Sequence, residues 1–74
     1  MLSVIIPARH EGGMLLRSLA ALTTVPGVDE VVVAAWGERA GVRRRAGRFP
    51  LLRWVECPIA GRGAQLNRGA AAAR

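Results

Sequence analysis

The chain contains very little of several residue types, and each scarcity argues against one class of protein or site. Its 74 residues include one cysteine, Cys57, which excludes an internal disulfide and a cysteine-based zinc site. It has no tyrosine, and two tryptophans and one phenylalanine are few rings for a protein that stacks nucleic-acid bases. We therefore expect a fold held together by packing alone, and nucleic acid is not expected as a partner.

Lysine is also missing, so arginine carries all 11 basic charges against 5 acidic residues, for a net charge of +6. A charge of this sign attracts anions such as phosphates. Arginine without lysine, in a chain rich in alanine, is nevertheless more typical of a GC-rich coding bias than of selection for one function. The run Arg43-Arg44-Arg45 with Arg48 is interpreted first as a solvated helix face. Contact with RNA, an acidic partner or a membrane surface is the alternative.

Long apolar runs are absent, and no stretch approaches the roughly 20 apolar residues that cross a bilayer. The segment Met1–Ala8 does not have the pattern of a signal peptide, because it lacks a basic start and Pro7 interrupts its apolar run. We therefore expect a cytoplasmic protein. The hydrophobic fraction of 51% argues against disorder, and 74 residues leave room for one domain at most.

What the chain does contain is a regular alternation of apolar strands and amphipathic helices. Apolar runs without polar alternation predict strands buried on both faces, as in a parallel sheet. Right-handed crossovers then give a three-stranded parallel sheet of order 3-2-1 with flanking helices, an α/β fold. The predicted strands are Leu2–Ile6, Glu30–Ala35 and Leu51–Glu56, and the predicted helices are Gly13–Thr23, a less regular one within Glu38–Arg48, and Ala64–Ala73.

The first strand is followed by a polar turn of Pro7, Ala8, Arg9, His10 and Glu11. These residues would lie at the carboxyl edge of the sheet, where open α/β sheets bind their ligands. Exposed backbone groups there can hydrogen-bond a base or a ribose, and Glu11 can accept from a hydroxyl or an imide N–H. A structural interpretation is equally good: Glu11 caps the first helix at its positive end, and His10 lies on the surface.

A second turn, Gly61-Arg62-Gly63, opens the last helix. Glycine lets the backbone approach a ligand closely, a helix start favours anions, and the planar guanidinium of Arg62 suits phosphate. Gln65 and Asn67 add amide groups to the same turn. The pattern lacks the third glycine of a dinucleotide fingerprint and the lysine of a P-loop, so an ordinary strand-to-helix turn is the competing interpretation.

Together the two turns resemble family 2 glycosyltransferases, inverting enzymes with the GT-A fold. The segment Val4-Ile5-Ile6-Pro7-Ala8-Arg9-His10-Glu11 is similar to the family's opening pattern, V-I-I-P-x-x-N-E. The segment Gly61-Arg62-Gly63-Ala64-Gln65-Leu66-Asn67-Arg68-Gly69-Ala70 is similar to its pattern G-[KR]-x-x-x-x-N-x-G, and to a bacterial variant, G-R-x-x-Q-[ML]-N-x-G-A. The resemblance implies a Rossmann-like domain that binds a nucleoside diphosphate sugar, with residues 1–74 as its N-terminal half, a single partial domain.

The resemblance also assigns residues to the nucleotide. Its implied binding residues are Pro7, Ala8, Arg9, His10, Glu11, Ala35, Arg62, Gly63 and Asn67, with Ala35 in place of the aspartate that bonds the base in this family. The D-x-D pattern that holds a divalent metal (Mg²⁺ or Mn²⁺) and the catalytic base are expected beyond Arg74. Transfer of the sugar to an acceptor would need those residues as well.

We therefore expect a partial domain that binds a nucleotide sugar and whose exposed sheet edges favour self-association. Two other interpretations stay open. One is a non-enzymatic, arginine-rich α/β module that binds RNA or an acidic partner, and the other is a degenerate reading frame without a function of its own. Binding that falls steeply with salt and ignores free nucleotides would mark the arginine-rich module.

Overall fold

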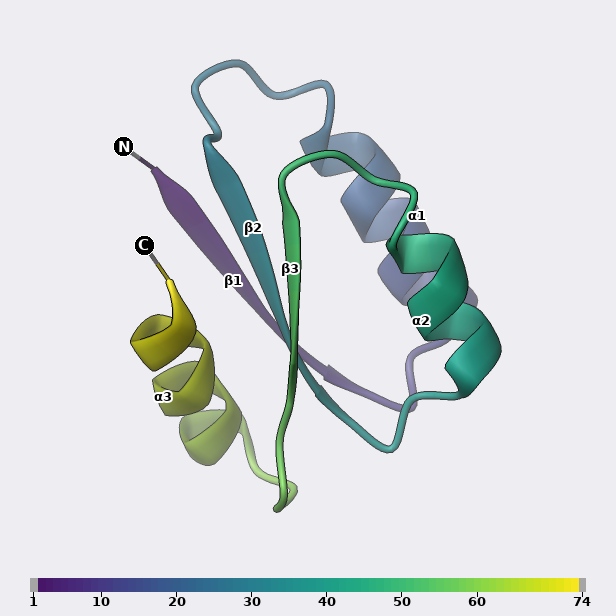
Figure 1. Ribbon diagram of the computed structural model, residues 1–74, viewed down its shortest axis with the longest axis vertical. Helices are drawn as coiled ribbons and strands as arrows, with labels where there is room; N and C mark the ends of the chain where they lie inside the picture. Colours follow the sequence, from purple (N-terminus) through teal and green to yellow (C-terminus); the bar gives the residue numbers. More distant parts are fainter. Residues whose placement is uncertain (1, 74) are drawn as a thin grey trace.

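A computed structural model describes residues 2–73 and shows strands alternating with helices (Figure 1). The strands are parallel, and the second lies between the first and the third. The predicted α/β class and strand order are therefore confirmed, since 3-2-1 and 1-2-3 are one sheet read from its two edges. The elements are β1 (Ser3–Arg9), α1 (Gly13–Leu22), β2 (Glu30–Trp36), α2 (Ala40–Ala46), β3 (Leu52–Glu56) and α3 (Arg62–Ala72).

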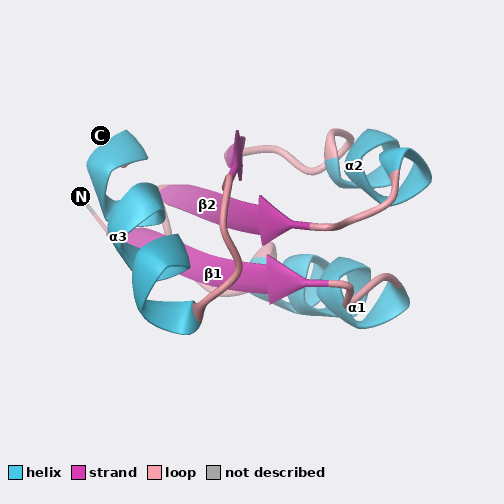
Figure 2. Cartoon of the chain, turned by 90° about the horizontal axis from the view of Figure 1, so that it is seen from below, coloured by secondary structure: helices cyan, strands magenta, loops and turns pink. Residues whose placement is uncertain are grey.

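The helices cover both faces of the sheet. α1 and α2 lie together on one face and α3 covers the other, as two views show (Figures 1 and 2). β2 is the centre of the core, because Val31 is 6% exposed and every residue from there to Ala35 is fully buried. On the side of α1 and α2 it packs against Leu15, Leu19 and Ala46. None of the helices described within residues 2–73 has the length and hydrophobicity of a membrane-spanning segment.

β1 differs from its prediction in length and in burial. It continues through Pro7 to Arg9, and it is an edge strand whose residues are mostly half-buried. The backbone explains both differences. The N–H of Glu30 donates to the carbonyl of Leu2 (3.2 Å), so the alternation of a parallel ladder turns even-numbered residues of β1 toward β2 and odd-numbered residues outward. Pro7 therefore faces outward, where its missing N–H costs the sheet no hydrogen bond.

α3 begins earlier than predicted and packs mainly over β1 and β2. Two of its residues make this contact close. A Cβ placed on Gly69 would be 2.5 Å from Cγ2 of Ile5, so the helix approaches the sheet where it has no side chain. Gln65 is 2% exposed, and its Nε2 donates to the carbonyls of Ala8 (2.8 Å) and Ala34 (2.9 Å). These bonds fix the first half of α3 to the ends of two strands.

α2 is shorter than the segment predicted for it and lies between the extended Arg39 and Gly47. Its run Arg43–Arg45 is exposed, as a solvated helix face predicts. One guanidinium of this run has a carboxylate nearby, since Nη1 of Arg43 lies 3.7 Å from Oε1 of Glu56. Arginines in the last turn of a helix also interact favourably with the negative end of its dipole. The run therefore has a structural role whether or not it binds a partner.

Candidate functional site

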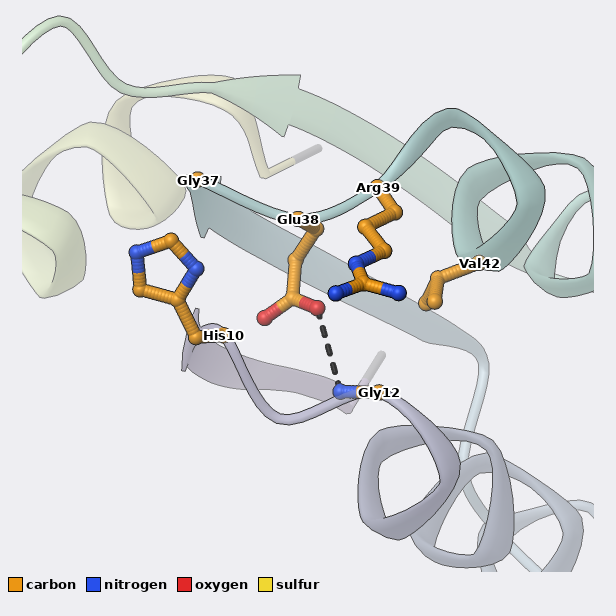
Figure 3. Close-up of a pocket in the computed structure, with 6 residues that line it drawn as sticks. All are labelled: His10, Gly12, Gly37, Glu38, Arg39 and Val42. Carbon is orange, nitrogen blue, oxygen red and sulfur yellow. Dashed lines mark hydrogen bonds between the residues drawn. The ribbon is translucent and has the colours of Figure 1, made fainter.

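The loops that follow β1 and β2 enclose a pocket at the carboxyl edge of the sheet, on the side of α1 and α2 (Figure 3). Its volume is about 320 Å³. Small-molecule sites span about 300–1,000 Å³, so this pocket is at the lower end of that range. Open α/β sheets bind their ligands at this edge. The residues that line the pocket are His10, Gly12, Gly37, Glu38, Arg39 and Val42.

Glu38 joins the two loops of the pocket. Its Oε2 accepts from the backbone N–H of Glu11 (2.7 Å) and its Oε1 from that of Gly12 (3.1 Å). These N–H groups lie at the start of α1, where backbone donors lack partners within the helix and the dipole favours a negative charge. The interpretation of Glu11 as the helix cap is therefore wrong, because the carboxylate at this position belongs to the loop after β2.

His10 lies against Gly37 and Trp36. Its φ of 52° is in the left-handed region, which residues other than glycine adopt rarely. Its ring meets that of Trp36 edge to face, with 5.1 Å between the ring centroids. A Cβ on Gly37 would lie 2.5 Å from the imidazole, and Gly37 itself has a φ of 72°. Both the backbone and the neighbouring ring therefore require glycine at this position.

The pocket contains one of the nine residues that the resemblance assigns to the nucleotide, His10. Ala8 and Ala35 are fully buried, so their methyl groups belong to the core and only their backbone atoms can serve a ligand. Pro7 is half-buried within β1. Nucleotide binding by these three residues stays a prediction.

Arg9 and Glu11 are exposed on the two sides of His10. The guanidinium carbon of Arg9 lies 5.5 Å from the centroid of the Trp36 ring, a cation–π contact. Trp36 thus already touches a cation and an imidazole of its own chain. Glu11 contributes its backbone N–H to the bond with Glu38.

Arg62, Gly63 and Asn67 are exposed in the first half of α3, on the other face of the sheet from α1 and α2 (Figure 1). None of them lines the pocket. The turn before them is held by Gln65, whose Oε1 accepts from the N–H of Gly61 (3.3 Å). The two turns therefore reach the same edge of the sheet but lead to helices on different faces, and the part of Arg62, Gly63 and Asn67 in binding stays a prediction.

Glu38 and Arg39 are the charged residues of the pocket that sequence reasoning did not assign to a ligand. A signal for them was present: Gly37-Glu38-Arg39 follows a buried strand, as the polar turn after the first strand does. Because parallel strands bring their carboxyl ends to one edge, both turns were candidates for the same site. The resemblance instead assigns Ala35, near the end of the same strand, to the nucleotide.

The described residues hold no metal site: among residues 2–73 no three His, Cys, Asp or Glu side chains come together. The divalent metal implied by the resemblance therefore has no ligand set in this part of the chain, and no step is assigned to it. Burial raises the pKa of the Cys57 thiol above its ordinary value of 9.0, while Arg68 acts in the opposite direction. Cys57 is therefore a neutral thiol at pH 7, and a weak nucleophile.

Comparisons with models of protein families, with curated proteins and with solved structures found no significant match. The pocket is therefore interpreted from its own geometry, and the family resemblance is a proposal.

Proposed function

We propose that this chain binds a nucleoside diphosphate sugar, as the nucleotide-binding part of a GT-A domain similar to family 2 glycosyltransferases. The observation that carries the proposal is the pocket between the loops after β1 and β2, which combines a hydrogen-bond acceptor, a ring and a cation in Glu38, His10 and Arg39. Transfer of the sugar to an acceptor would need residues beyond Arg74.

The chemistry of the pocket supports a nucleotide. A nucleobase has a flat face that suits an imidazole, and an edge of N–H groups that suits a carboxylate. Phosphate groups suit a guanidinium and a chain with a net charge of +6. The loop after β1 contains the last two residues of the family's opening pattern, His10 and Glu11, and forms one wall of the pocket through His10 and Gly12.

Glu38 supports recognition of a base that carries an imide N–H, such as uracil. In the resembled family an aspartate after the second strand bonds the base, and Ala35 stands at that position with a buried methyl group. Glu38 brings a carboxylate to the pocket from the next loop. Each of its oxygens accepts one backbone N–H and keeps a second lone pair. An imide N–H can therefore be accepted without breaking the contact with α1.

In this proposal the described residues bind and orient the nucleotide, and none of them acts as a catalytic base. Sugar transfer takes a base for the acceptor hydroxyl and a positive group beside the leaving diphosphate. In this proposal no described residue is assigned as the base, and Arg39 is the cation that lines the pocket.

Filling the pocket tests the proposal. Isothermal titration with UDP should give a Kd on the order of 1 mM or below, a binding free energy of about −4 kcal/mol or better. Val42→Phe places a ring in the pocket and should weaken UDP binding about tenfold or more, which is about 1.4 kcal/mol. Val25→Phe makes the same change in the exposed loop between α1 and β2, far from the pocket, and should leave the affinity unchanged. Absence of UDP binding by the unmodified chain, or equal affinities of the two variants, would count against the proposal.

The exposed arginines in and directly after α2 favour one alternative function, a surface that binds RNA or an acidic partner. Arg44, Arg45 and Arg48 are exposed and make no ion pair among residues 2–73. Such a surface predicts binding of single-stranded RNA that weakens steeply with salt, depends on these three arginines and is unaffected by UDP. Fluorescence polarisation of a labelled RNA at two salt concentrations, with and without UDP, separates the two functions.

A further inference from the structure

We propose that Arg39 binds the phosphate groups of a nucleotide in this pocket, a role that the sequence had suggested for Arg62. The inference rests on the proposed function. It adds the residue that binds the phosphate groups and the orientation of the nucleotide in the pocket. It follows from where the guanidinium groups lie relative to the pocket.

The guanidinium of Arg39 is available to a ligand. Its side chain lies between those of Glu38 and Val42, along the wall of the pocket (Figure 3). The residue is exposed, and its guanidinium makes no hydrogen bond or ion pair among residues 2–73. Its backbone is held, because its carbonyl accepts from the N–H of Val42 (3.0 Å) and of Arg43 (3.2 Å). Within residues 2–73, Arg39 is thus an unpaired cation on a fixed backbone.

The other arginines near this edge of the sheet are less suited to the role. The guanidinium of Arg43 lies 3.7 Å from the carboxylate of Glu56. The guanidinium of Arg9 lies over the ring of Trp36. Arg62 belongs to α3 on the other face of the sheet and does not line the pocket. A phosphate bound in the pocket therefore meets Arg39 first.

The charges of the pocket also set the direction in which a nucleotide lies. The carboxylate of Glu38 repels phosphate and attracts N–H donors, so it faces the base. His10 lies on one side of Glu38 and Arg39 on the other (Figure 3). The base therefore lies toward His10 and the phosphates toward Arg39. A planar guanidinium can donate two parallel N–H bonds to one phosphate, so a nucleotide should bind more tightly than its nucleoside.

The test compares uridine, UMP and UDP by NMR titration of the full chain and of three variants, two of which each remove one positive charge. The unmodified chain should bind UDP about tenfold more tightly than uridine, as charge-assisted bonds to phosphate predict. Arg39→Gln should remove this preference and leave the Kd of uridine unchanged. Arg62→Gln removes the same charge from another exposed helix start and should keep the preference. Arg39→Lys should keep part of it, because lysine retains the charge but not the planar fork. Circular dichroism verifies that each variant is folded.

The possible outcomes distinguish the role of Arg39 from nucleotide binding by the pocket as a whole. A preference for UDP that survives Arg39→Gln, or that Arg62→Gln abolishes, overturns the role of Arg39 and leaves nucleotide binding intact. Equal binding of uridine and UDP by the unmodified chain overturns the inference and leaves only recognition of the nucleoside. Binding of none of the three ligands overturns the proposed function, and the inference with it.

Discussion

Two residues of α3, Gly69 and Gln65, contact the sheet so closely that few other residues could replace them. At Gly69 the space for a side chain is occupied by Ile5. At Gln65 a buried amide bonds backbone groups of the sheet and of the turn before the helix, so that each of its polar atoms has a partner. Loss of such partners leaves buried donors or acceptors unsatisfied, at a cost of about 1–3 kcal/mol. Other positions on the same helix are open, and a Cβ on Gly63 would meet no atom within 4 Å.

Two glycine substitutions in α3 should therefore have opposite effects. Gly69→Ala should lower the free energy of unfolding by about 1–3 kcal/mol, because its Cβ would overlap the side chain of Ile5. Gly63→Ala should raise it by up to about 1 kcal/mol, because alanine is the better helix former and the space is empty. Urea unfolding followed by circular dichroism measures both changes. Equal effects of the two substitutions would contradict the close packing of α3 on β1.

Cys57 gives the fold a pH dependence at alkaline pH. Burial raises the pKa of its thiol above 9.0 in the folded chain, so the unfolded chain loses this proton first as the pH rises. The contribution to stability is complete below about pH 9 and is lost as the pH rises through the folded pKa. The chain has no lysine or tyrosine, so no other side-chain type titrates between about pH 9 and 11.

Cys57→Ala should therefore flatten the plot of unfolding free energy against pH between about pH 8.5 and 10.5. Urea unfolding of both proteins across this range measures the effect. If the two proteins lose stability in parallel above about pH 9, the burial of the thiol is not the cause.

At the scale of elements, α1 depends on a residue of another loop for its start. Its N-cap, Gly12, has no side chain, and the first turn contains no acidic residue. The negative charge that complements the helix dipole comes from Glu38, across the pocket. One carboxylate therefore stabilises the start of α1 and connects the two loops that line the pocket.

Glu38→Ala should lower the free energy of unfolding by about 1–3 kcal/mol, because two backbone donors lose a charged acceptor. Glu11→Ala removes the same charge from the loop directly before α1 and should change stability by less than about 0.5 kcal/mol, because Glu11 is exposed and its side chain does not cap the helix. High salt should reduce the difference between the losses of stability caused by Glu38→Ala and Glu11→Ala, because it screens the charge of Glu38. Thermal unfolding of both variants at two salt concentrations measures it. A larger effect of Glu11→Ala would contradict the assignment of the cap.

The hydrophobic pattern was enough to predict the type and order of the elements. The apolar run in β2 has no polar alternation, which is why burial on both faces was correct there. In β3, Leu52 and Trp54 both pack against the core on the side of α1 and α2. The predicted end of β1 at Ile6 was wrong, because the strand continues through Pro7 to Arg9. Proline ends a strand only where an N–H at its position would have to bond a neighbouring strand, and Pro7 faces outward.

The candidate site was less predictable because its contacts join distant parts of the chain. Glu38 accepts bonds from residues 26 and 27 positions away, and Gln65 donates across 31 and 57 positions. No local pattern shows which of several polar residues at a sheet edge will meet. Local rules did identify the edge itself, because the carboxyl ends of parallel strands must lie together.

At the scale of the whole molecule, the sheet has two open edges. The outward N–H groups of Ser3 and Ile5 on β1 have no neighbouring strand among the described residues, whereas those of Val4 and Ile6 point to β2. Open edges favour pairing with another copy of the chain, while a net charge of +6 opposes it. We therefore expect association that is weak in low salt and stronger at high ionic strength.

Hydrogen exchange followed by NMR tests this expectation residue by residue. At low concentration the amides of Val4 and Ile6 should exchange slowly and those of Ser3 and Ile5 quickly, because only the first pair is bonded within the sheet. Salt at about 0.5 M screens the repulsion between positively charged chains. Raising the protein concentration under these conditions should slow hydrogen exchange of the outward amides of an edge strand. Outward amides of β1 and β3 that stay fast at all concentrations would contradict pairing through the edges.

Chemical-shift mapping with UDP is the decisive test of whether the pocket between the loops after β1 and β2 binds a nucleoside diphosphate. If the nucleotide binds there, the amide signals of Gly12, Gly37 and Glu38 should shift together with one Kd, while the signal of Gly27 in the loop between α1 and β2 should not move. Unchanged amides around the pocket at millimolar UDP, or shifts confined to other parts of the chain, would contradict it.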